Sequence, residues 1–136
     1  MRLWHKNLII LLPRQQLLGQ WRECCLIAKN ISEKGNPNHI LVNKIMNYPI
    51  SHFYTYGMLI HRIMKFRGYK CDFNRFNRYF NSDISTVEFD EIFCGWHNAR
   101  YLRQCYYNLE EKHDCGVISN KEWNKINDEV TPKLFW

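Results

Sequence analysis

The 136-residue sequence lacks a long hydrophobic run near its start. A basic opening is followed by only five consecutive apolar residues, at positions 8–12. A signal peptide needs an apolar core of about 7–15 residues, and a membrane-spanning helix needs about 20. We therefore expect a cytoplasmic protein that does not associate with a membrane.

The arrangements that would make the cysteines a disulfide framework or a zinc site are also missing. Cys24 and Cys25 are neighbours in a predicted helix, so their side chains point in different directions. The other four form no Cys-x-x-Cys pair and no zinc-finger spacing with histidine: Cys71, Cys94, Cys105 and Cys115. Without a secretory signal, buried and reduced thiols are the favoured interpretation. The sequence predicts no metal site and no cofactor.

Repeats, low-complexity tracts and linkers are absent as well, so residues 1–136 predict one compact domain. A chain of this length can bury a hydrophobic core, and 46% of its residues are hydrophobic. The net charge of +6 and the pI near 9.1 favour an anionic partner, which is most often a nucleic acid. A basic surface without such a partner is the alternative.

The sequence patterns predict an all-α fold of three long helices with short helices and loops. Apolar residues recur at helical spacing, and no run alternates in the way that predicts a strand. The expected helices span 13–33, 37–47, 51–67, part of 72–80, 85–93 and 96–113, with a short last helix after 119. Proline opens a helix, serine caps one and glycine ends one. The residues in these roles are Pro13, Ser51, Gly35, Gly68 and Gly116, and the pair Ser119 and Glu122 forms a capping box.

The first predicted helix carries an unusual polar face. Its members are three or four residues apart: Gln16, Gly19, Gln20 and Glu23. A glycine inside a helix costs about 1 kcal/mol relative to alanine, so Gly19 needs a reason. One reason is close packing of another helix. The other is a site at Glu23 that something must approach closely, with the glutamines and Glu23 facing solvent together.

This helix and two later segments resemble a known enzyme family. The first helix reads Gln-x-Leu-Leu-x-x-aromatic-Arg-Glu over 15–23, and Arg2 precedes it. An aromatic helix follows over 52–60 and ends in a basic Arg-Gly-Tyr at 67–69, and a third helix over 96–112 includes His97. Together these resemble the pyrimidine dimer DNA glycosylases, the phage-type endonuclease V enzymes that excise ultraviolet photoproducts. The resemblance extends over most of the chain.

The resemblance implies which residues act. In that family the nucleophile is the α-amino group of the chain itself, which here belongs to Met1 because the large Arg2 should prevent removal of the methionine. The essential glutamate corresponds to Glu23. The residues expected to contact DNA are Arg2, Arg22, Gln16, Gln20, His97, Arg67 and Lys70. Other members start with threonine, carry histidine at the place of Gln16 and arginine at the place of Leu26, and these departures leave the type of lesion open.

The chemistry of an α-amino group fits this role. Such a group has a pKa of about 7.7–8.0, against about 10.4 for lysine, so more of it is neutral at physiological pH. A neutral amine can displace a base from the sugar and form a Schiff base, which leads to strand cleavage by β-elimination. Glu23 would stabilise the positive charge on the sugar and move protons. The alternative role for Glu23 is a salt bridge with Lys29 or near Arg22.

A second basic region lies between residues 62 and 79, where cationic and aromatic side chains alternate. It fits phosphate contacts combined with base stacking, although a solvated helix end above core aromatics explains it nearly as well. Trp123 and the terminal residues 133–136 are expected to pack on the core. The resemblance implies a monomer, associated with the nucleoid, that binds double-stranded DNA containing a lesion. Another lesion or modified base as the substrate, and a DNA-binding module without activity, are the alternatives.

Overall fold

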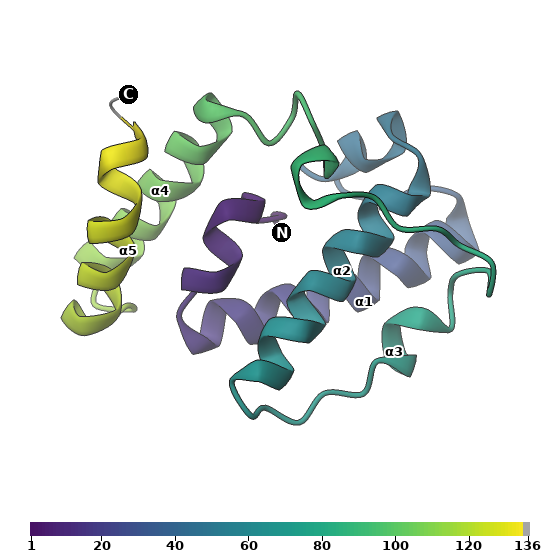
Figure 1. Ribbon diagram of the computed structural model, residues 1–136, viewed down its shortest axis with the longest axis horizontal. Coiled ribbons are helices and arrows are strands. Elements are labelled where there is room, and N and C mark those ends of the chain that lie inside the picture. Colours follow the sequence, from purple (N-terminus) through teal and green to yellow (C-terminus); the bar gives the residue numbers. More distant parts are fainter. Residues whose placement is uncertain (135–136) are drawn as a thin grey trace.

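The computed structural model describes residues 1–134 and is all-helical, without a strand in that range (Figure 1). The prediction of an all-α fold is confirmed. Four helices are long: α1 (Arg14–Lys34), α2 (Ile50–Phe66), α4 (Ala99–Asp114) and α5 (Asn120–Leu134). The shorter elements are α3 (Asn74–Asn77) and the 3-10 helices η1 (Lys6–Leu11), η2 (Asn43–Asn47) and η3 (Phe89–Glu91). The expected short last helix is therefore a long one.

Helix α1 has the ends that its sequence predicts. Pro13 is its N-cap, and Gly35 ends it with a left-handed φ of 80°. The amide of Gly35 still donates to the carbonyl of Ile31 over 3.0 Å, and its left-handed conformation, which glycine adopts without strain, turns the chain out of the helix. One side of α1 is buried through Leu17, Gln20, Trp21, Cys24, Cys25, Ile27 and Ala28.

Helix α2 begins one residue before the expected cap. Its N-cap is Pro49, and Ser51 lies inside the first turn, where its carbonyl accepts a hydrogen bond from the Thr55 hydroxyl. The expected stop at Gly68 is correct, since this residue has φ of 81° and donates to the carbonyl of Lys65. At Gly57 an added Cβ would collide with the ring of Phe76, so this glycine lets α3 pack directly against α2.

The segments between the long helices contain less helix than predicted. In the range 37–47 only η2 is helical, and in 85–93 only η3 is. The prediction of a helix over 85–93 is wrong because side chains of α2 supply acceptors for this stretch. The amide of Val87 donates to the Thr55 hydroxyl over 3.0 Å, and the amide of Phe93 donates to the His52 ring over 3.0 Å.

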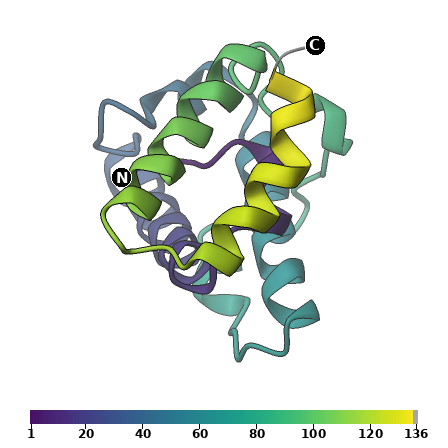
Figure 2. The same cartoon turned by 90° about the vertical axis from the view of Figure 1, so that its left-hand side faces the viewer.

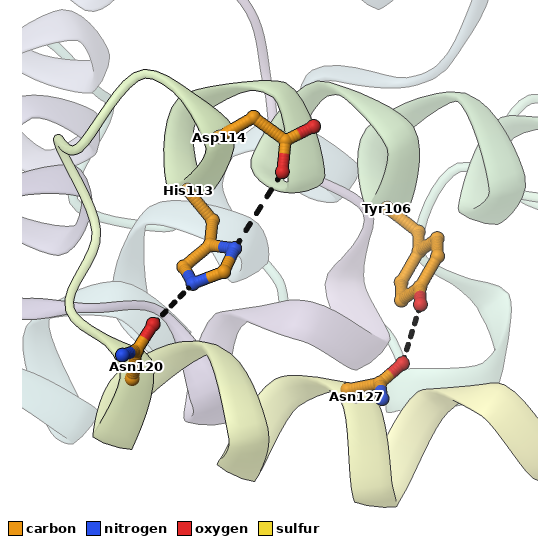
Figure 3. Close-up of polar contacts among 5 residues, drawn as sticks. All are labelled: Tyr106, His113, Asp114, Asn120 and Asn127. Atoms are coloured by element: carbon orange, nitrogen blue, oxygen red, sulfur yellow. Dashed lines mark hydrogen bonds and ion pairs between the residues drawn. The ribbon is translucent and has the colours of Figure 1, made fainter.

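Helices α4 and α5 form an antiparallel pair that is closed by polar contacts (Figure 2). The predicted capping box starts α5, because the amide of Glu122 donates to the Ser119 hydroxyl and the amide of Ser119 donates to the Glu122 carboxylate. Between the helices His113 pairs with Asn120 at 2.7 Å, and Tyr106 donates to Asn127 (Figure 3). His113 also lies 3.7 Å from Asp114, beside it on α4.

Trp123 of α5 is buried between the two helices, as expected. Its ring stacks on that of His113 and packs at a tilt against that of Tyr106. The expectation for the chain end concerns residues 133–136, of which 135 and 136 lie outside the described range. Lys133 is exposed.

The first eleven residues lie between the two helical layers. The segment passes through the middle of the molecule, with α1 and α2 on one side and α4 and α5 on the other (Figures 1 and 2). It contributes Leu3, Trp4, Leu8 and Ile9 to the core. The N-terminal segment is thus a structural element of the core, although it has no partner strand.

The cysteines agree only in part with the prediction. All six are free, and Cys24, Cys25 and Cys105 are buried. Cys94 and Cys115 are exposed, so the prediction of burial is wrong for these two. Within residues 1–134 no helix is long and apolar enough to cross a membrane.

Candidate active site

The start of the chain is held by side chains instead of by a partner strand. The carbonyl of Leu3 accepts from Tyr101 over 2.6 Å, and the carbonyl of Trp4 accepts from Tyr56 over 2.6 Å. The amide of Arg2 donates to the Glu23 carboxylate over 3.4 Å. Tyr101 belongs to α4, Tyr56 to α2 and Glu23 to α1, so three helices fix the backbone of residues 2–4.

Gln20 contributes most to this arrangement and is not where the sequence places it. Its side chain is buried, only 1% exposed, so the expectation that it faces solvent and contacts DNA is wrong. Its oxygen accepts from the amide of Trp4 at 2.7 Å, and its nitrogen donates to the carbonyl of Arg2 at 2.9 Å. The N-terminal segment covers this part of the polar face of α1, which helical periodicity alone does not reveal.

Glu23 stands next to the chain start. Its half-buried carboxylate accepts from the Arg2 amide and, at 3.3 Å, from the side chain of Gln20. The Met1 amine is three covalent bonds from the Arg2 nitrogen, so the terminal amine and the carboxylate belong to one local cluster. Across the described residues Glu23 forms no ion pair, so the alternative of a salt bridge with Lys29 or near Arg22 is wrong.

The guanidinium of Arg2 turns toward α4. It lies 3.9 Å from the Cys105 sulfur and packs over the Trp4 ring, with 5.7 Å to the ring centroid. It lines a surface hollow of about 420 Å³ together with Trp96, Tyr101, Gln104, Ile40, Leu41 and Lys44. Two cations and two aromatic rings beside the chain start suit a phosphate and a base.

The outer surface of α1 is open at Gly19. An added Cβ there would meet only the guanidinium of Arg22, at 3.9 Å, which is an ordinary contact. Close packing of another helix is therefore not the reason for this glycine. Arg22 is exposed, Gln16 is half-buried, and Leu26 is 47% exposed. These residues border Glu23 on a surface without a bulky cover.

His97 is a buried core residue, so the expectation that it contacts DNA is wrong. The N-cap of α4 is Asn98, whose side chain accepts from the Tyr101 amide over 2.9 Å. His97 accepts from the amide of Lys6 over 3.0 Å and stacks on His5, with ring centroids 5.1 Å apart. Burial lowers the pKa of His97 to about 2 and that of His5 to about 4. Both rings are therefore neutral, and they lock the N-terminal segment onto the turn before α4.

The cations of the second basic region, residues 62–79, have different surroundings in the fold. Arg67 donates to the carbonyls of Leu12 and Ile10 over 2.7 and 2.8 Å, so it closes the end of η1; it is partly exposed, and its contact with DNA stays a prediction. Lys70 is exposed, as are Arg62, Lys65, Arg75 and Arg78. Among the aromatic residues Phe76 is buried, whereas Phe66 is 90% exposed. The region therefore offers cations for phosphates and one largely exposed aromatic ring, that of Phe66, for stacking.

Sequence reasoning missed Tyr56 and Tyr101 as functional residues. Both occupy positions that periodicity assigns to packing, and both hydroxyls bind the backbone of the chain start. Burial raises the pKa of both above the ordinary value, so these hydroxyls stay protonated and donate. A buried tyrosine needs a partner for its hydroxyl, and this requirement is the signal in the sequence. Among the described residues no cluster of three or more histidines, cysteines or carboxylates could hold a metal ion.

Comparison with known protein families identifies a match. A model of the family described as pyrimidine dimer DNA glycosylase matches residues 1–77. No curated protein and no solved structure matches significantly. The matched part contains the chain start, all of α1 with Gln20 and Glu23, and all of α2 with Tyr56. It covers more than half of the 136 residues, and on this basis the chain belongs to the pyrimidine dimer DNA glycosylase family.

Proposed function

We propose that this protein excises pyrimidine photodimers from duplex DNA and then cuts the damaged strand, with the Met1 amine as nucleophile and Glu23 as the catalytic carboxylate. The observation that carries the proposal is the hydrogen bond from the Arg2 amide to Glu23, at 3.4 Å. This bond joins the start of the chain to Glu23, whose half-buried carboxylate lies beside it. The role of Met1 requires that its amine is free.

The reaction begins at the sugar. The neutral amine nitrogen forms a bond to C1′ while the bond from C1′ to the base breaks, and the base leaves with the electron pair and takes up a proton. Positive charge develops on the sugar as the base leaves. The Glu23 carboxylate stabilises this charge electrostatically, which is worth most in a site that is partly shielded from water.

Strand cleavage follows from the same intermediate. Opening of the sugar ring gives a protonated Schiff base between the Met1 nitrogen and C1′. This cation makes the hydrogen on C2′ acidic, and Glu23 accepts that proton. The C3′–O bond then breaks, and the 3′ phosphate leaves with the electron pair. The steps need no oxidant or reductant.

Binding of the duplex is electrostatic in this proposal. Arg2 and Lys44 flank the hollow beside the chain start, and Arg22 and Lys70 are exposed on the surface. Their contacts to phosphates would position the sugar of the lesion near Met1. Reaching C1′ inside a duplex requires that a nucleotide leaves the stack.

Borohydride trapping tests the proposal. Borohydride reduces a Schiff base to a stable amine, so a protein of confirmed N-terminal mass should form a covalent adduct with photodimer DNA through Met1. Acetylation of the amine, or an uncleaved tag before it, should abolish the adduct and leave binding intact. An adduct from the blocked protein would identify a lysine as the nucleophile and refute the role of Met1. A binding module would give no adduct from any form.

A second candidate is the same mechanism on another lesion or modified base. The observation that favours it is the surface beside Glu23, where Gln16 and Leu26 replace the histidine and the arginine of other family members. A panel of duplexes with single lesions, each assayed in a single turnover, separates the two candidates. Faster excision of another modified base than of the photodimer would favour the second.

A further inference from the structure

We infer that Gln20 is the positioning residue of this site. Its buried amide fixes the chain start and the Glu23 carboxylate relative to each other, a task that requires a group which both donates and accepts hydrogen bonds. The inference rests on the proposed function, since it concerns how the nucleophile and the carboxylate are brought together.

The side chain of Gln20 uses both of its functional atoms. Its oxygen accepts from the Trp4 amide at 2.7 Å and lies 3.1 Å from the Tyr56 hydroxyl. Its nitrogen donates to the Arg2 carbonyl at 2.9 Å and to the Glu23 carboxylate at 3.3 Å. An amide has two donor hydrogens and two acceptor lone pairs, and this environment occupies both hydrogens and one lone pair, while the single Tyr56 hydrogen goes mainly to the Trp4 carbonyl at 2.6 Å. No other side chain in the described part of the chain bonds to both ends of the segment formed by residues 2–4.

The surroundings also fix the orientation of the amide. If the group were reversed, its nitrogen would face the donating amide of Trp4. Its oxygen would face the Arg2 carbonyl and the Glu23 carboxylate, which are both acceptors. Neither pair can form a hydrogen bond, so only one orientation is stable.

A charged carboxylate cannot replace this amide. It has no hydrogen to donate to Arg2, and it would repel Glu23 at a site that is only 1% exposed. A protonated carboxyl group can replace it, since its hydroxyl donates to one partner while its carbonyl oxygen accepts from the Trp4 amide. A glutamate at position 20 should therefore work only in its neutral form.

The titratable groups that bond to Gln20 or to its partners come from three helices and the first segment. They are Glu23 on the same helix, Tyr56 of α2, Arg2 with the Met1 amine bonded next to it in the chain, and Tyr101 and Cys105 of α4. Tyr56 and Tyr101 stay protonated because burial raises the pKa of each. Rates of a variant divided by rates of the wild type at the same pH cancel the titration of the shared groups.

The test compares Gln20→Met and Gln20→Glu with the wild type, and Gln15→Met serves as the matched control because Gln15 is exposed on the same helix. The assay is single-turnover excision and borohydride adduct formation on photodimer DNA, with duplex affinity and a thermal melt at each pH. Misplacement of a reacting group by about 1 Å costs about 100-fold in rate, so Gln20→Met should lose about that factor with little change in affinity. Gln15→Met should match the wild type.

The pH dependence separates positioning from stability. While the pH is above the pKa of the introduced carboxyl, the rate of Gln20→Glu relative to the wild type should rise about 10-fold for each unit by which the pH is lowered. It should level off once the carboxyl is neutral, whereas the relative rate of Gln20→Met should stay flat. A folded Gln20→Met with the wild-type rate would overturn the inference. So would a relative rate of Gln20→Glu that is independent of pH and below that of the wild type. If Gln20→Met does not fold, the Gln20→Glu profile decides. A wild type without excision or adduct refutes the proposed function itself, and this inference with it.

Discussion

The N-terminal segment and the α4–α5 pair both bury apolar side chains in the middle of the molecule, but they satisfy their backbone polar groups differently. In α4 and α5 the helices and their caps do this locally, as at Asn98 and Ser119. In residues 2–4 the partners are side chains from three helices: Gln20, Glu23, Tyr56 and Tyr101. The pair α4–α5 can be changed at its surface without moving the site, whereas the segment depends on each distant partner.

The largest effect is expected at Glu23. Glu23→Gln keeps the size of the side chain and an oxygen that can accept from Arg2, and it removes only the charge. Loss of one preorganised electrostatic partner costs about 2.7–4 kcal/mol, so single-turnover excision should fall roughly 100- to 1000-fold with normal affinity for damaged DNA. Glu33→Gln, near the exposed end of α1, is the control and should retain full activity. Full activity in Glu23→Gln would remove this residue from the chemistry.

Acid should weaken the attachment of the N-terminal segment next. The pKa values of His5 and His97 are lowered to about 4 and about 2, against 6.5 in the unfolded chain. Between pH 6.5 and about 4 the unfolded chain therefore binds more protons, so the free energy of unfolding falls as pH falls. Each histidine contributes up to about 1.4 kcal/mol per pH unit in this window.

Urea unfolding at pH 7.5, 6 and 5 measures this slope. His97→Gln removes one of the two contributions and should flatten the curve, even if it lowers stability at pH 7.5. An identical slope in the wild type and in His97→Gln would show that these rings do not control the acid sensitivity.

A change of charge beside the site should affect DNA binding more than the same change on α5. Arg22→Gln should weaken binding of an undamaged duplex by about 1–3 kcal/mol, as expected for the loss of a charge-assisted hydrogen bond to phosphate. It should also reduce the steep salt dependence of the affinity. Lys121→Gln, exposed at the start of α5, is the comparison. Fluorescence anisotropy over a range of salt concentrations measures both, and equal losses would mean that the duplex does not prefer the surface of α1.

Loss of a cap on α4 should change stability and spare the chemistry. The Asn98 side chain accepts from the amide of Tyr101, and an N-cap replaced by alanine typically costs about 1 kcal/mol. Asn98→Ala should lower the midpoint of urea unfolding. Its excision rate, measured roughly 20–30 °C below the melting temperature where the variant is folded, should equal that of the wild type. A large loss of excision in a folded Asn98→Ala would mean that α4 is as critical as the N-terminal segment.

The smallest effect is expected at Gly19. Gly19→Ala should raise the free energy of unfolding by about 0.5–1 kcal/mol, because glycine is a poor helix former and the new methyl meets only Arg22. Gly19→Leu should also fold but should impair excision, since its bulk would stand on the open surface beside Glu23. Thermal melts and single-turnover rates measured together distinguish the two effects. Destabilisation by alanine would show that the helix needs this glycine for its structure.

The sequence predicts helices well where local chemistry determines them. The glycines at 35, 68 and 116 end helices, and Ser119 starts one, because caps act within a few residues. Residues 85–93 are not helical because Thr55 and His52, more than 30 positions earlier, supply their acceptors. Such long-range partners leave no local pattern.

The same distinction applies to the site. Glu23 lies on the polar face that helical spacing predicts. The burial of Gln20 and His97 could not be predicted, because it depends on where the N-terminal segment runs, and that segment has no periodic pattern. The DNA contact of Arg67 is predicted from the family resemblance and the basic cluster around it, and the structure adds local partners, the carbonyls of Ile10 and Leu12, that the sequence does not reveal. A polar residue on a predicted helix face therefore indicates a site only when it is known whether another segment packs over that face.

The threading of the N-terminal segment between the helices has a consequence for synthesis. Lys6 bonds to a residue 91 positions later, and Leu3 to one 98 positions later. A ribosome adds about 5–20 residues per second, so these partners emerge roughly 5–20 s after the segment itself. The N-terminal segment is thus among the last parts of the fold to reach its final position. If Met1 is the nucleophile, as proposed, enzymes that acetylate or trim new chains can reach its amine during that interval, and we expect competition with them to set the fraction of active molecules.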